Sequence, residues 1–379
     1  MDGRFTVSAE FDPIAARIGT MQLQADVEQR LVRIGWRSGP LPDDAPADAY
    51  VARVIAQHRA GYEIHDGLNA INAQPAPRFL KRGLDPAERP AVGDFVLVSP
   101  STPPQIEQLL PRRTQLVRAA AGERHQRQII AANIDAVFVM NGLDGDLNPA
   151  RIERYLVLVE GSGAAAVIVL TKADRADYSE AMIASLRPRV PANVEILAIN
   201  AKSPESVEPL LAYLKPGDTA VLVGSSGVGK STLTNTLLGE ARQATNTVRE
   251  NDSRGRHTTT HRALIMLPSG GCLIDTPGMR EIKLTGDEEL DQGQFADIDA
   301  LAQECRFGDC GHQSEPGCAV RAALADGRLD PERWQNYLKL RDELAAAADS
   351  LEAQMRRKSE TRVLTKALGK RLSEKYGRR

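Results

Sequence analysis

The spacing of hydrophobic residues divides the chain into three regions. Between residues 50 and 120 the apolar residues come in short runs that turn residues interrupt, and residues 92–98 pass from a Gly-Asp turn into β-branched and aromatic side chains. Such runs predict short strands. Several short strands over ~70 residues favour a small barrel, with the OB-fold as the first candidate and another small β-domain as the alternative.

After Arg127 the apolar runs become continuous, as in strands that are buried on both sides. They lie at residues 135–143, 164–174, 194–201, 218–227 and 270–278. Stretches with helical character separate them, at residues 149–160, 179–186, 204–214 and 230–238. Continuous apolar strands that alternate with helices predict a mostly parallel sheet with helices on both faces.

The last region begins near Asp291 and predicts a helix, then a cysteine-rich segment, then helices from Pro331 through most of the tail. A chain of 379 residues exceeds what one hydrophobic core usually supports, so we expect a multidomain α/β fold. The predicted division is an N-terminal extension at 1–45, a barrel at 46–120, an α/β domain at 125–285, and a helical C-terminal domain with a basic tail at 290–379.

Composition excludes several classes of protein. Hydrophobic residues make up 42% and charged residues 26%, which is typical of a globular chain and not of a disordered or fibrous one. No apolar run approaches the ~18 residues of a membrane-spanning helix, and the N-terminus lacks the basic and apolar segments of a secretion signal. We expect a cytoplasmic protein with no membrane partner. The net charge of -2 excludes a global basic field, so any nucleic acid must bind to local faces.

The string GSSGVGKS matches the phosphate-binding pattern G-x-x-x-x-G-K-[ST] in full, and a chance glycine-rich turn is the alternative. The string follows a predicted strand and opens a predicted helix, where backbone N–H groups can hold phosphate charge. We expect Lys230 to reach the β- and γ-phosphates and the Ser231 hydroxyl to bind Mg²⁺. The predicted nucleotide contacts of this segment are Gly224, Ser225, Ser226, Gly227, Val228, Gly229, Lys230, Ser231 and Thr232.

The string DTPG ends a later predicted strand and forms the metal side of the site. Asp275 can hold the Mg²⁺ shell, and the Gly278 amide can bind the γ-phosphate. Between this string and the phosphate-binding loop lies GRHTTT, a polar stretch without apolar periodicity, which predicts a mobile loop. One of Thr258, Thr259 and Thr260, with Thr259 as our choice, is expected to sense Mg²⁺ and the γ-phosphate. For a threonine run alone, a solvated loop is the alternative.

The string TKAD ends another buried strand and resembles the [NT]-K-x-D element of GTPases. The carboxylate of Asp174 can accept hydrogen bonds from N1–H and the 2-amino group of guanine, while the stem of Lys172 packs along the base. Adenine lacks this donor pair and would leave the acceptor unpaired. TKAD alone is a weak signal, but together with GSSGVGKS and DTPG it assigns guanine binding to Thr171, Lys172, Ala173 and Asp174.

These motifs occur in an unusual order. Most GTPases run from the phosphate-binding loop to the switch threonine, DxxG and then [NT]-K-x-D, whereas here TKAD comes first, followed by Asn200-Ala201-Lys202 in place of an S-A-K element. The site can survive this order because each motif sits at the end of a strand. The sequence therefore predicts a circularly permuted P-loop domain with GTP and GDP as ligands. The permutation also attaches the C-terminal domain directly to the switch region.

A cysteine-rich segment supplies a candidate metal site with the four residues Cys305, Cys310, His312 and Cys318. Three thiolates and one imidazole form a closed tetrahedral set, which predicts a structural Zn²⁺ and not a catalytic one. The alternative is separate buried cysteines with a surface histidine. Cys272 precedes DTPG on a strand and is expected in the core.

Several strings together resemble the ribosome small-subunit-dependent GTPase A family (RsgA). They are TKAD before GSSGVGKS, then GRHTTTHR, LIDTPGMRE, CRFGDCGHQSEPGCAV, and LLPRRTQLVRAA followed by QIIAANIDAVFVM. The resemblance covers about residues 49–334. It implies an RNA-binding OB-fold, a permuted GTPase domain and a zinc-bearing C-terminal domain.

The resemblance also implies a partner and a cycle. The protein would bind the 30S ribosomal subunit, made of 16S rRNA and ribosomal proteins, in its GTP state during late maturation. The subunit would stimulate hydrolysis, and the protein would leave when GTP is spent. One-to-one binding to a subunit suits a monomer.

Met279 stands where common GTPases have a glutamine that orients water, and a thioether cannot do this. The resemblance implies that His257 takes the role, which gives His257, Lys230 and Thr259 as the predicted catalytic residues. A solvated loop histidine, or one that contacts rRNA, is the alternative. Asn200 departs from the usual serine, but the base contact there is mainly through the backbone.

Aromatic residues form only 4% of the chain, so phosphate contact is expected more than base stacking. The candidates on the barrel and the linker are Arg78, Lys81, Arg82, Arg112, Arg113 and Arg118. The tail adds Arg356, Arg357, Lys358, Arg362, Lys366, Lys370, Arg371, Lys375, Arg378 and Arg379, for which a solvated helix is the alternative.

The expected activity is a Mg²⁺-dependent GTPase, and two other hypotheses stay open. One is an RNA-binding scaffold that holds GTP as a passive ligand, which Met279 allows and the intact Lys230, Ser231 and Asp275 disfavour. The other is an ATPase, which TKAD disfavours.

Overall fold

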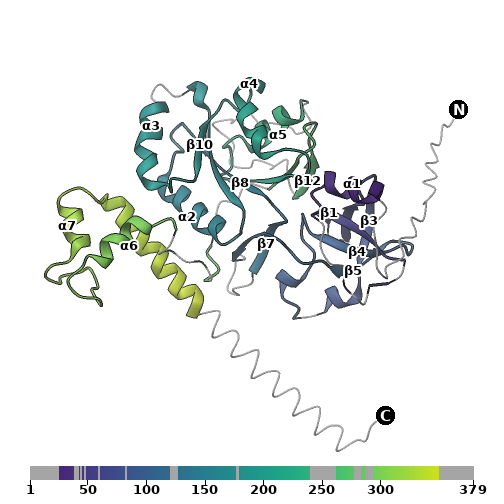
Figure 1. The fold of residues 1–379 in the computed structure, drawn as a ribbon, viewed down its shortest axis with the longest axis horizontal. Coiled ribbons are helices and arrows are strands. Elements are labelled where there is room, and N and C mark those ends of the chain that lie inside the picture. The colour runs from purple at the N-terminus through teal and green to yellow at the C-terminus, as the bar shows by residue number, and fades with distance from the viewer. Residues whose placement is uncertain are drawn as a thin grey trace, which may run out of the picture.

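The computed structural model describes residues 25–37, 42, 45–46, 48–58, 60–81, 83–119, 127–175, 179–239, 262–276, 283–286, 288, 290 and 293–349. In these ranges the chain forms a β-barrel, a sheet covered by helices, and a group of C-terminal helices (Figure 1). This is the predicted multidomain α/β fold. No helix among the described residues is long and apolar enough to cross a membrane.

The barrel contains the five strands β1 (Tyr50–His58), β2 (Gly61–His65), β3 (Ala70–Pro75), β4 (Phe95–Ser99) and β5 (Gln105–Leu109). They pair in the order β1-β2-β3-β5-β4, and β4 also pairs with β1, so the sheet closes on itself. Val54, Ile64 and Val96 are fully buried inside, as alternation along a strand requires. The predicted OB-type barrel is confirmed. Two short 3-10 helices, η1 (Pro77–Leu80) and η2 (Pro86–Glu88), lie between β3 and β4.

A helix that the sequence pattern did not predict packs on the outer wall of the barrel, against β1 and β4. Helix α1 (Ala25–Arg33) leads into Ile34 and Trp36, which are buried against barrel residues. The rings of Trp36 and Phe95 meet edge to face, with centroids 4.9 Å apart. Part of the predicted N-terminal extension therefore packs against the outside of the barrel, in a hydrophobic cluster separate from the barrel interior.

The second part is built on six neighbouring strands in the order β10-β9-β8-β11-β13-β12. The strands are β8 (Ala136–Gly142), β9 (Ala165–Thr171), β10 (Glu195–Ala198), β11 (Thr219–Gly224), β12 (Ala263–Met266) and β13 (Cys272–Asp275). All pairs are parallel except β12 with β13, which confirms the predicted, mostly parallel sheet.

Helices cover both faces of this sheet, because successive strand residues point to opposite sides. In β11, Val221 and Val223 belong to a core cluster with Tyr155 of α2 (Pro149–Glu160), whereas Leu222 belongs to a second cluster with Leu233 of α5 (Lys230–Leu238). The helices are α2 (Pro149–Glu160), α3 (Ser179–Leu186), α4 (Pro204–Val207) and α5 (Lys230–Leu238), with the 3-10 helices η3 (Ala173–Arg175), η4 (Arg187–Arg189) and η5 (Glu208–Tyr213).

Three predicted helices, at 149–160, 179–186 and 230–238, have the predicted bounds, but the fourth differs. The stretch 204–214 was predicted as one helix, and it forms the short α4 followed by the 3-10 helix η5. Pro209 explains the change, because it lacks an N–H and its ring clashes with the carbonyl four residues earlier.

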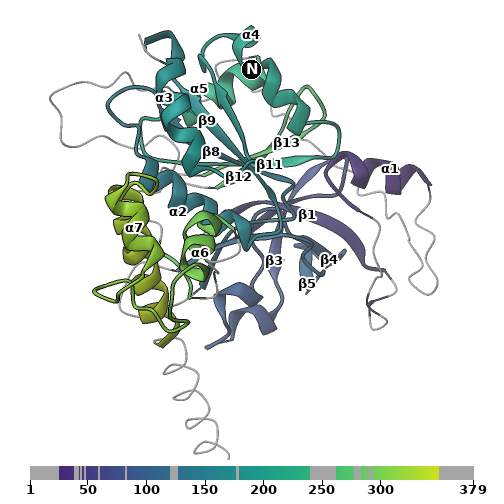
Figure 2. The ribbon, with the colours of Figure 1, turned by 60° about the vertical axis from the view of Figure 1, so that its left-hand side comes forward.

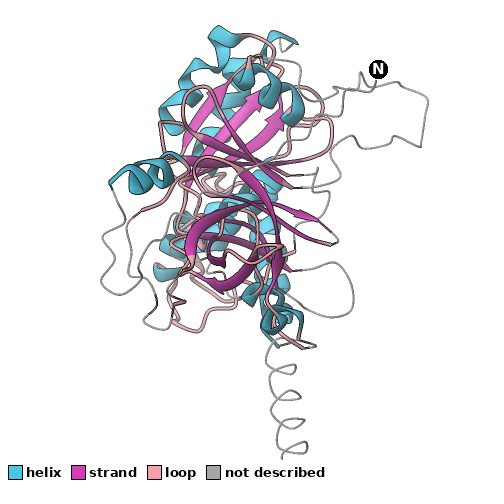
Figure 3. Ribbon diagram, turned by 90° about the vertical axis from the view of Figure 1, so that its right-hand side faces the viewer, coloured by secondary structure: helices cyan, strands magenta, loops and turns pink. Residues whose placement is uncertain are grey.

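The barrel and the second sheet are joined edge to edge. Strand β1 pairs with β12 through Ala56 and Ala263, which makes one eleven-stranded sheet. Figure 3 shows the strands of the barrel continuing into those of the second part. The ribbon β6 (Gln115–Ala119) and β7 (Arg127–Ala132) lies between the two parts in the sequence.

Arg53 of β1 ties this joint together and is fully buried. Its guanidinium donates to the carbonyls of Ile34, Gly93 and Asn133 at 2.5, 3.1 and 2.9 Å. It also donates to Thr219 Oγ1, at the start of β11, at 2.9 Å. Burial lowers the pKa of Arg53, and nearby carboxylates oppose this shift. One side chain thus links the residues that follow α1, the barrel, the residue that follows β7, and the second sheet.

The C-terminal part contains α6 (Ala296–Gln303), α7 (Ala319–Ala325) and a helix over residues 331–349. Figure 2 shows it against α2, on one side of the sheet. Helix 331–349 includes residues 345–348, whose alanines favour helix. The predicted basic tail begins beyond the described residues.

Candidate functional site

Three of the predicted motifs meet at one edge of the sheet. TKAD ends β9, the phosphate-binding loop ends β11, and Asp275 ends β13. These strands are parallel, so their carboxyl ends share an edge, which is where ligands bind in open α/β sheets.

The phosphate-binding loop depends on glycine at two positions. Gly224 has φ 149°, and a Cβ atom there would lie 2.6 Å from the carbonyl oxygen of Met140. Gly229, the N-cap residue of α5, has φ 104°. Glycine adopts such backbone angles without steric cost. The loop can therefore turn sharply from β11 and direct the N-terminus of α5 toward the edge of the sheet.

Lys230 points back into the loop from the first position of α5. Its Nζ atom donates to the carbonyls of Gly224 at 2.8 Å and Ser225 at 2.6 Å, and its side chain is buried. Burial lowers the pKa of Lys230 to about 8, although Asp275 and Asp146 oppose the shift. Phosphate oxygens in the loop would add negative charge and favour the charged ammonium.

Thr171, the first residue of TKAD, connects this predicted guanine-binding motif to the phosphate-binding loop. Its buried Oγ1 lies 2.6 Å from the carbonyl oxygen of Val228 and 3.3 Å from that of Asn141, and it can donate to either. Two motifs that lie 57 residues apart are thus held together by one side chain.

We expect Thr171→Val to weaken GDP binding ~10-fold. Valine keeps the shape but leaves the buried Val228 carbonyl without its donor, which costs ~1–3 kcal/mol. The measurement is the Kd of a fluorescent GDP analogue. Thr102→Val, at an exposed position of the barrel, is the matched control. An unchanged Kd in Thr171→Val would show that this contact does not shape the site.

The other three residues of TKAD are more exposed than Thr171. Lys172 has a positive φ of 62°, and its Nζ atom contacts Asp144 Oδ2 at 2.5 Å. Ala173 donates its N–H to the carbonyl of Ile199 at 3.2 Å, and Asp174 is exposed. The carboxylate of Asp174 is therefore accessible to a ligand.

The Asn200-Ala201-Lys202 segment lies beside this motif. Asn200 Oδ1 accepts from the N–H of Lys202 at 3.0 Å, and the carbonyl of Ala201 accepts from Thr236 Oγ1 of α5 at 2.7 Å. Helix α5 and the Asn200-Ala201-Lys202 segment are thus fixed relative to one another.

Asp275 is buried at the end of β13, and the next residue, Thr276, donates its hydroxyl to the carbonyl of Leu222 at 2.6 Å. Gly278, His257 and the threonines 258–260 lie outside the described residues, as does Met279. Their predicted roles in phosphate, Mg²⁺ and water binding stay predictions.

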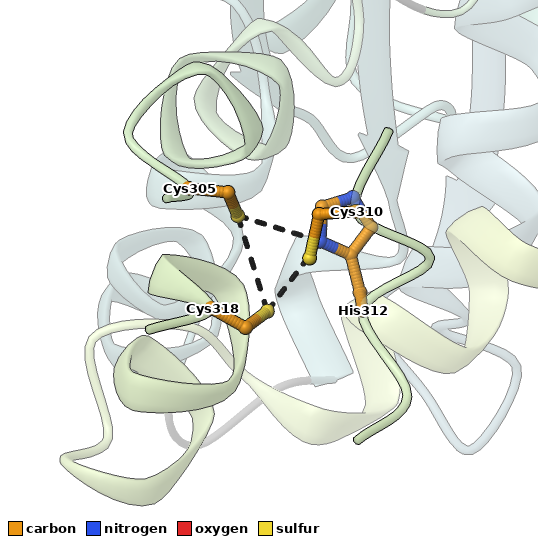
Figure 4. A group of neighbouring side chains, drawn as sticks. All are labelled: Cys305, Cys310, His312 and Cys318. Carbon is orange, nitrogen blue, oxygen red and sulfur yellow. Dashed lines mark hydrogen bonds between the residues drawn. The ribbon is translucent and has the colours of Figure 1, made fainter. Parts of the chain in front are cut away.

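The structure brings the four predicted metal ligands together (Figure 4). Cys305 Sγ and Cys318 Sγ lie 3.9 Å apart, and His312 Nδ1 lies 3.6 Å from the first and 3.5 Å from the second. Four ligands around Zn²⁺ at ~2.0–2.3 Å have edges of ~3.5–3.8 Å in a tetrahedron. The ligand atoms of all four residues lie within 4.8 Å of one another, so the cluster is compatible with zinc.

Backbone N–H groups donate to two of the sulfur atoms in this cluster. The N–H of Ala319 donates to Cys305 Sγ at 3.4 Å, and the N–H of Arg321 to Cys318 Sγ at 3.5 Å. Burial raises the pKa of Cys305, but backbone hydrogen bonds outweigh this effect and hold the pKa below its usual value. Cys272 is fully buried in β13, away from the cluster, as predicted.

Comparison with known proteins gives the family. The RsgA GTPase family model matches residues 109–285. The small ribosomal subunit biogenesis GTPase RsgA of Xanthomonas campestris pv. campestris is 56% identical over 331 residues, covering 85% of this chain and 90% of the relative. The protein of the same name from Xanthomonas axonopodis pv. citri is 56% identical over 330 residues, with the same coverage. The chain belongs to the RsgA GTPase family.

Solved structures agree with this membership. YjeQ from Thermotoga maritima is 26% identical, has a TM-score of 0.56, and aligns over 78% of this chain and 99% of its own. YloQ, described as a circularly permuted GTPase, is 24% identical with a TM-score of 0.52, over 79% of this chain and 96% of its own, and supports the fold alone. The circularly permuted fold is thereby confirmed.

A second family model, that of the ABC transporter, matches residues 207–366. This range contains the phosphate-binding loop at 224–231, which many nucleotide-binding families share. The range excludes TKAD at 171–174, so this family model does not cover the predicted guanine-binding residues.

The structure differs from the prediction at Arg112 and adds a contact at Asp146. Arg112 was predicted to contact RNA phosphate, but its guanidinium is largely buried, contacts both oxygens of Asp94 at 2.7 and 2.8 Å and donates to the carbonyl of Arg89. It serves to hold the barrel to the linker. Conversely, Asp146 was not predicted, although its Oδ2 accepts from Ser225 Oγ in the phosphate-binding loop at 2.7 Å.

Proposed function

We propose that this protein is a Mg²⁺-dependent GTPase that acts in late maturation of the small ribosomal subunit. It binds the subunit in its GTP state, hydrolyses GTP when the subunit stimulates it, and leaves with GDP. Membership of the RsgA family supports this function. The observation that carries it is the hydrogen bond between Thr171 and the Val228 carbonyl, which places a guanine-type motif beside a phosphate-binding loop.

Each residue of the site has a proposed contact with the nucleotide or with Mg²⁺. Asp174 selects guanine with its exposed carboxylate, and Lys172 lies along the base. Lys230 and the N–H groups of 224–231 hold the β- and γ-phosphates in place. Ser231, Thr259 and Asp275 would hold Mg²⁺, which supplies positive charge against the phosphate oxygens. Gly278 would donate its amide to the γ-phosphate.

His257 is proposed to orient the attacking water, since Met279 cannot do so. Replacing His257 with alanine would reduce stimulated turnover and leave GTP binding intact. Unchanged stimulated turnover in that variant would exclude the role.

The proposed RNA contacts lie on the barrel, the linker and the tail. Arg78 lies in η1 and Lys81 directly follows it, and both are exposed at the barrel surface. Arg113 is half exposed while it pairs with Asp135 at 2.7 Å. Phosphate contact through such side chains would weaken as salt rises. We propose that the protein acts as a monomer in the cytoplasm.

Nucleotide competition tests the chemistry of this function directly. Turnover of GTP should continue in excess ATP, since adenine lacks the donors that Asp174 accepts from. It should stop when EDTA removes Mg²⁺. Equal competition by ATP would favour the ATPase alternative. Tight GTP binding without turnover under any condition would favour a passive ligand in a scaffold.

A further inference from the structure

Helix α2 lies between α5, the helix that follows the phosphate-binding loop, and the C-terminal helix α6, as both Figure 1 and Figure 2 show. Residues four apart on a helix share a face, so Arg151 and Tyr155 lie together, and Glu153 points elsewhere. Tyr155 packs in one core cluster with Val223, the residue before the loop. One helix therefore contacts both regions.

On its outer side, α2 is docked to the C-terminal part through Glu153, which is fully buried. Glu153 Oε1 accepts from Arg333 at 2.7 Å and from Arg189 at 2.8 Å, and Oε2 accepts from Asn336 Nδ2 at 2.5 Å. A buried carboxylate is stable only with such partners, so their geometry fixes how the C-terminal helix sits on α2. Arg154 and Glu343 add a more exposed ion pair at 2.7 Å.

At its N-terminus, α2 is tied to the phosphate-binding loop. Asp146 accepts from Ser225 Oγ at 2.7 Å and pairs with Arg151 of α2 at 2.8 Å. Asn148, the N-cap residue, accepts from the N–H of Arg151 at 2.9 Å. The carbonyl of Ser225 in turn accepts from Lys230. The position of the first turn of α2 thus sets the position of Ser225 beside the phosphate-binding lysine.

We propose that α2 is a positioning element that couples the docking of the C-terminal helices to guanine-nucleotide affinity, with Asp146 as the positioning residue for Ser225. The inference rests on the proposed function for the identity of the ligand. A contact that shifts the C-terminal helices would change nucleotide affinity through α2. This route is separate from the direct chain connection that follows DTPG.

A double-mutant cycle on GDP affinity tests the coupling. Asn336→Ala removes one donor to Glu153, and Asp146→Ala removes the acceptor for Ser225. We expect each change alone to weaken binding of a fluorescent GDP analogue ~3–10-fold. The double variant should lose no more affinity than the more strongly affected single variant. Asp146→Asn keeps an acceptor oxygen and should recover most of the affinity. Asn69→Ala, in an exposed barrel turn, is the matched control.

Two results would overturn the inference: an unchanged Kd in Asn336→Ala, or effects of the two changes that multiply as independent sites do. If the Asn336→Ala variant loses its zinc, Glu343→Gln repeats the test at the partly exposed ion pair with Arg154, without changing a partner of buried Glu153. Failure of the parent protein to bind GDP at all would instead contradict the proposed function, so the two failures are distinguishable.

Discussion

Asp174→Asn is expected to weaken GTP binding at least ~100-fold and to make xanthosine triphosphate the better ligand. The aspartate carboxylate accepts from two guanine donors, and each hydrogen bond to a charged group is worth ~1.5–3 kcal/mol. An asparagine presents an NH₂ group to the 2-amino group of guanine, so donor faces donor. Xanthine has a carbonyl at that position and accepts from the new NH₂ group.

The measurement is competition of GTP, ATP and xanthosine triphosphate against a fluorescent GDP analogue. Asp349→Asn, at an exposed position in the last described helix, removes the same charge far from the motif along the chain and should leave all three affinities unchanged. Retention of full GTP affinity by Asp174→Asn would mean that TKAD does not read the base.

Cys318→Ala is expected to abolish zinc binding and to loosen the C-terminal part. Structural zinc sites contribute ~10–16 kcal/mol of binding free energy that appears as folding stability. Cys318 is also the N-cap residue of α7, where its sulfur accepts from the N–H of Arg321. Loss of the metal should therefore release α7 and the packing of His312 against Trp334, whose ring centroids lie 5.8 Å apart.

Zinc per chain and near-ultraviolet circular dichroism of the tryptophans measure this effect. Cys272→Ala is the matched control, since Cys272 is also buried but lies in β13 outside the cluster. It should retain zinc. If Cys318→Ala binds zinc as well as the parent protein, the cluster is not the metal site.

Much of the nucleotide site follows from local sequence because its motifs lie where strands end and helices begin. Helix α2 starts where predicted because Asn148 caps it and Pro149 occupies its first turn. The same logic failed at residues 204–214, where Pro209 inside the helical stretch changed an α-helix into a 3-10 helix.

The contacts that position the site could not be predicted in this way, because they join residues far apart in the chain. Asp146 and its partner Ser225 are 79 residues apart, and Arg53 and its partner Thr219 are 166 apart. An arginine inside an apolar strand was the only local signal for the second contact. The misassigned Arg112 shows the same limit, since its pairing with Asp94 depends on how the barrel closes.

We propose that the small ribosomal subunit activates this GTPase. Phosphate release from GTP should be measured with the protein alone and with purified 30S subunits, 50S subunits and 70S ribosomes in parallel. We expect a rate at least ~10-fold higher with 30S subunits than with the protein alone, and little change with 50S subunits. Tight GTP binding with no increase from any particle would contradict it.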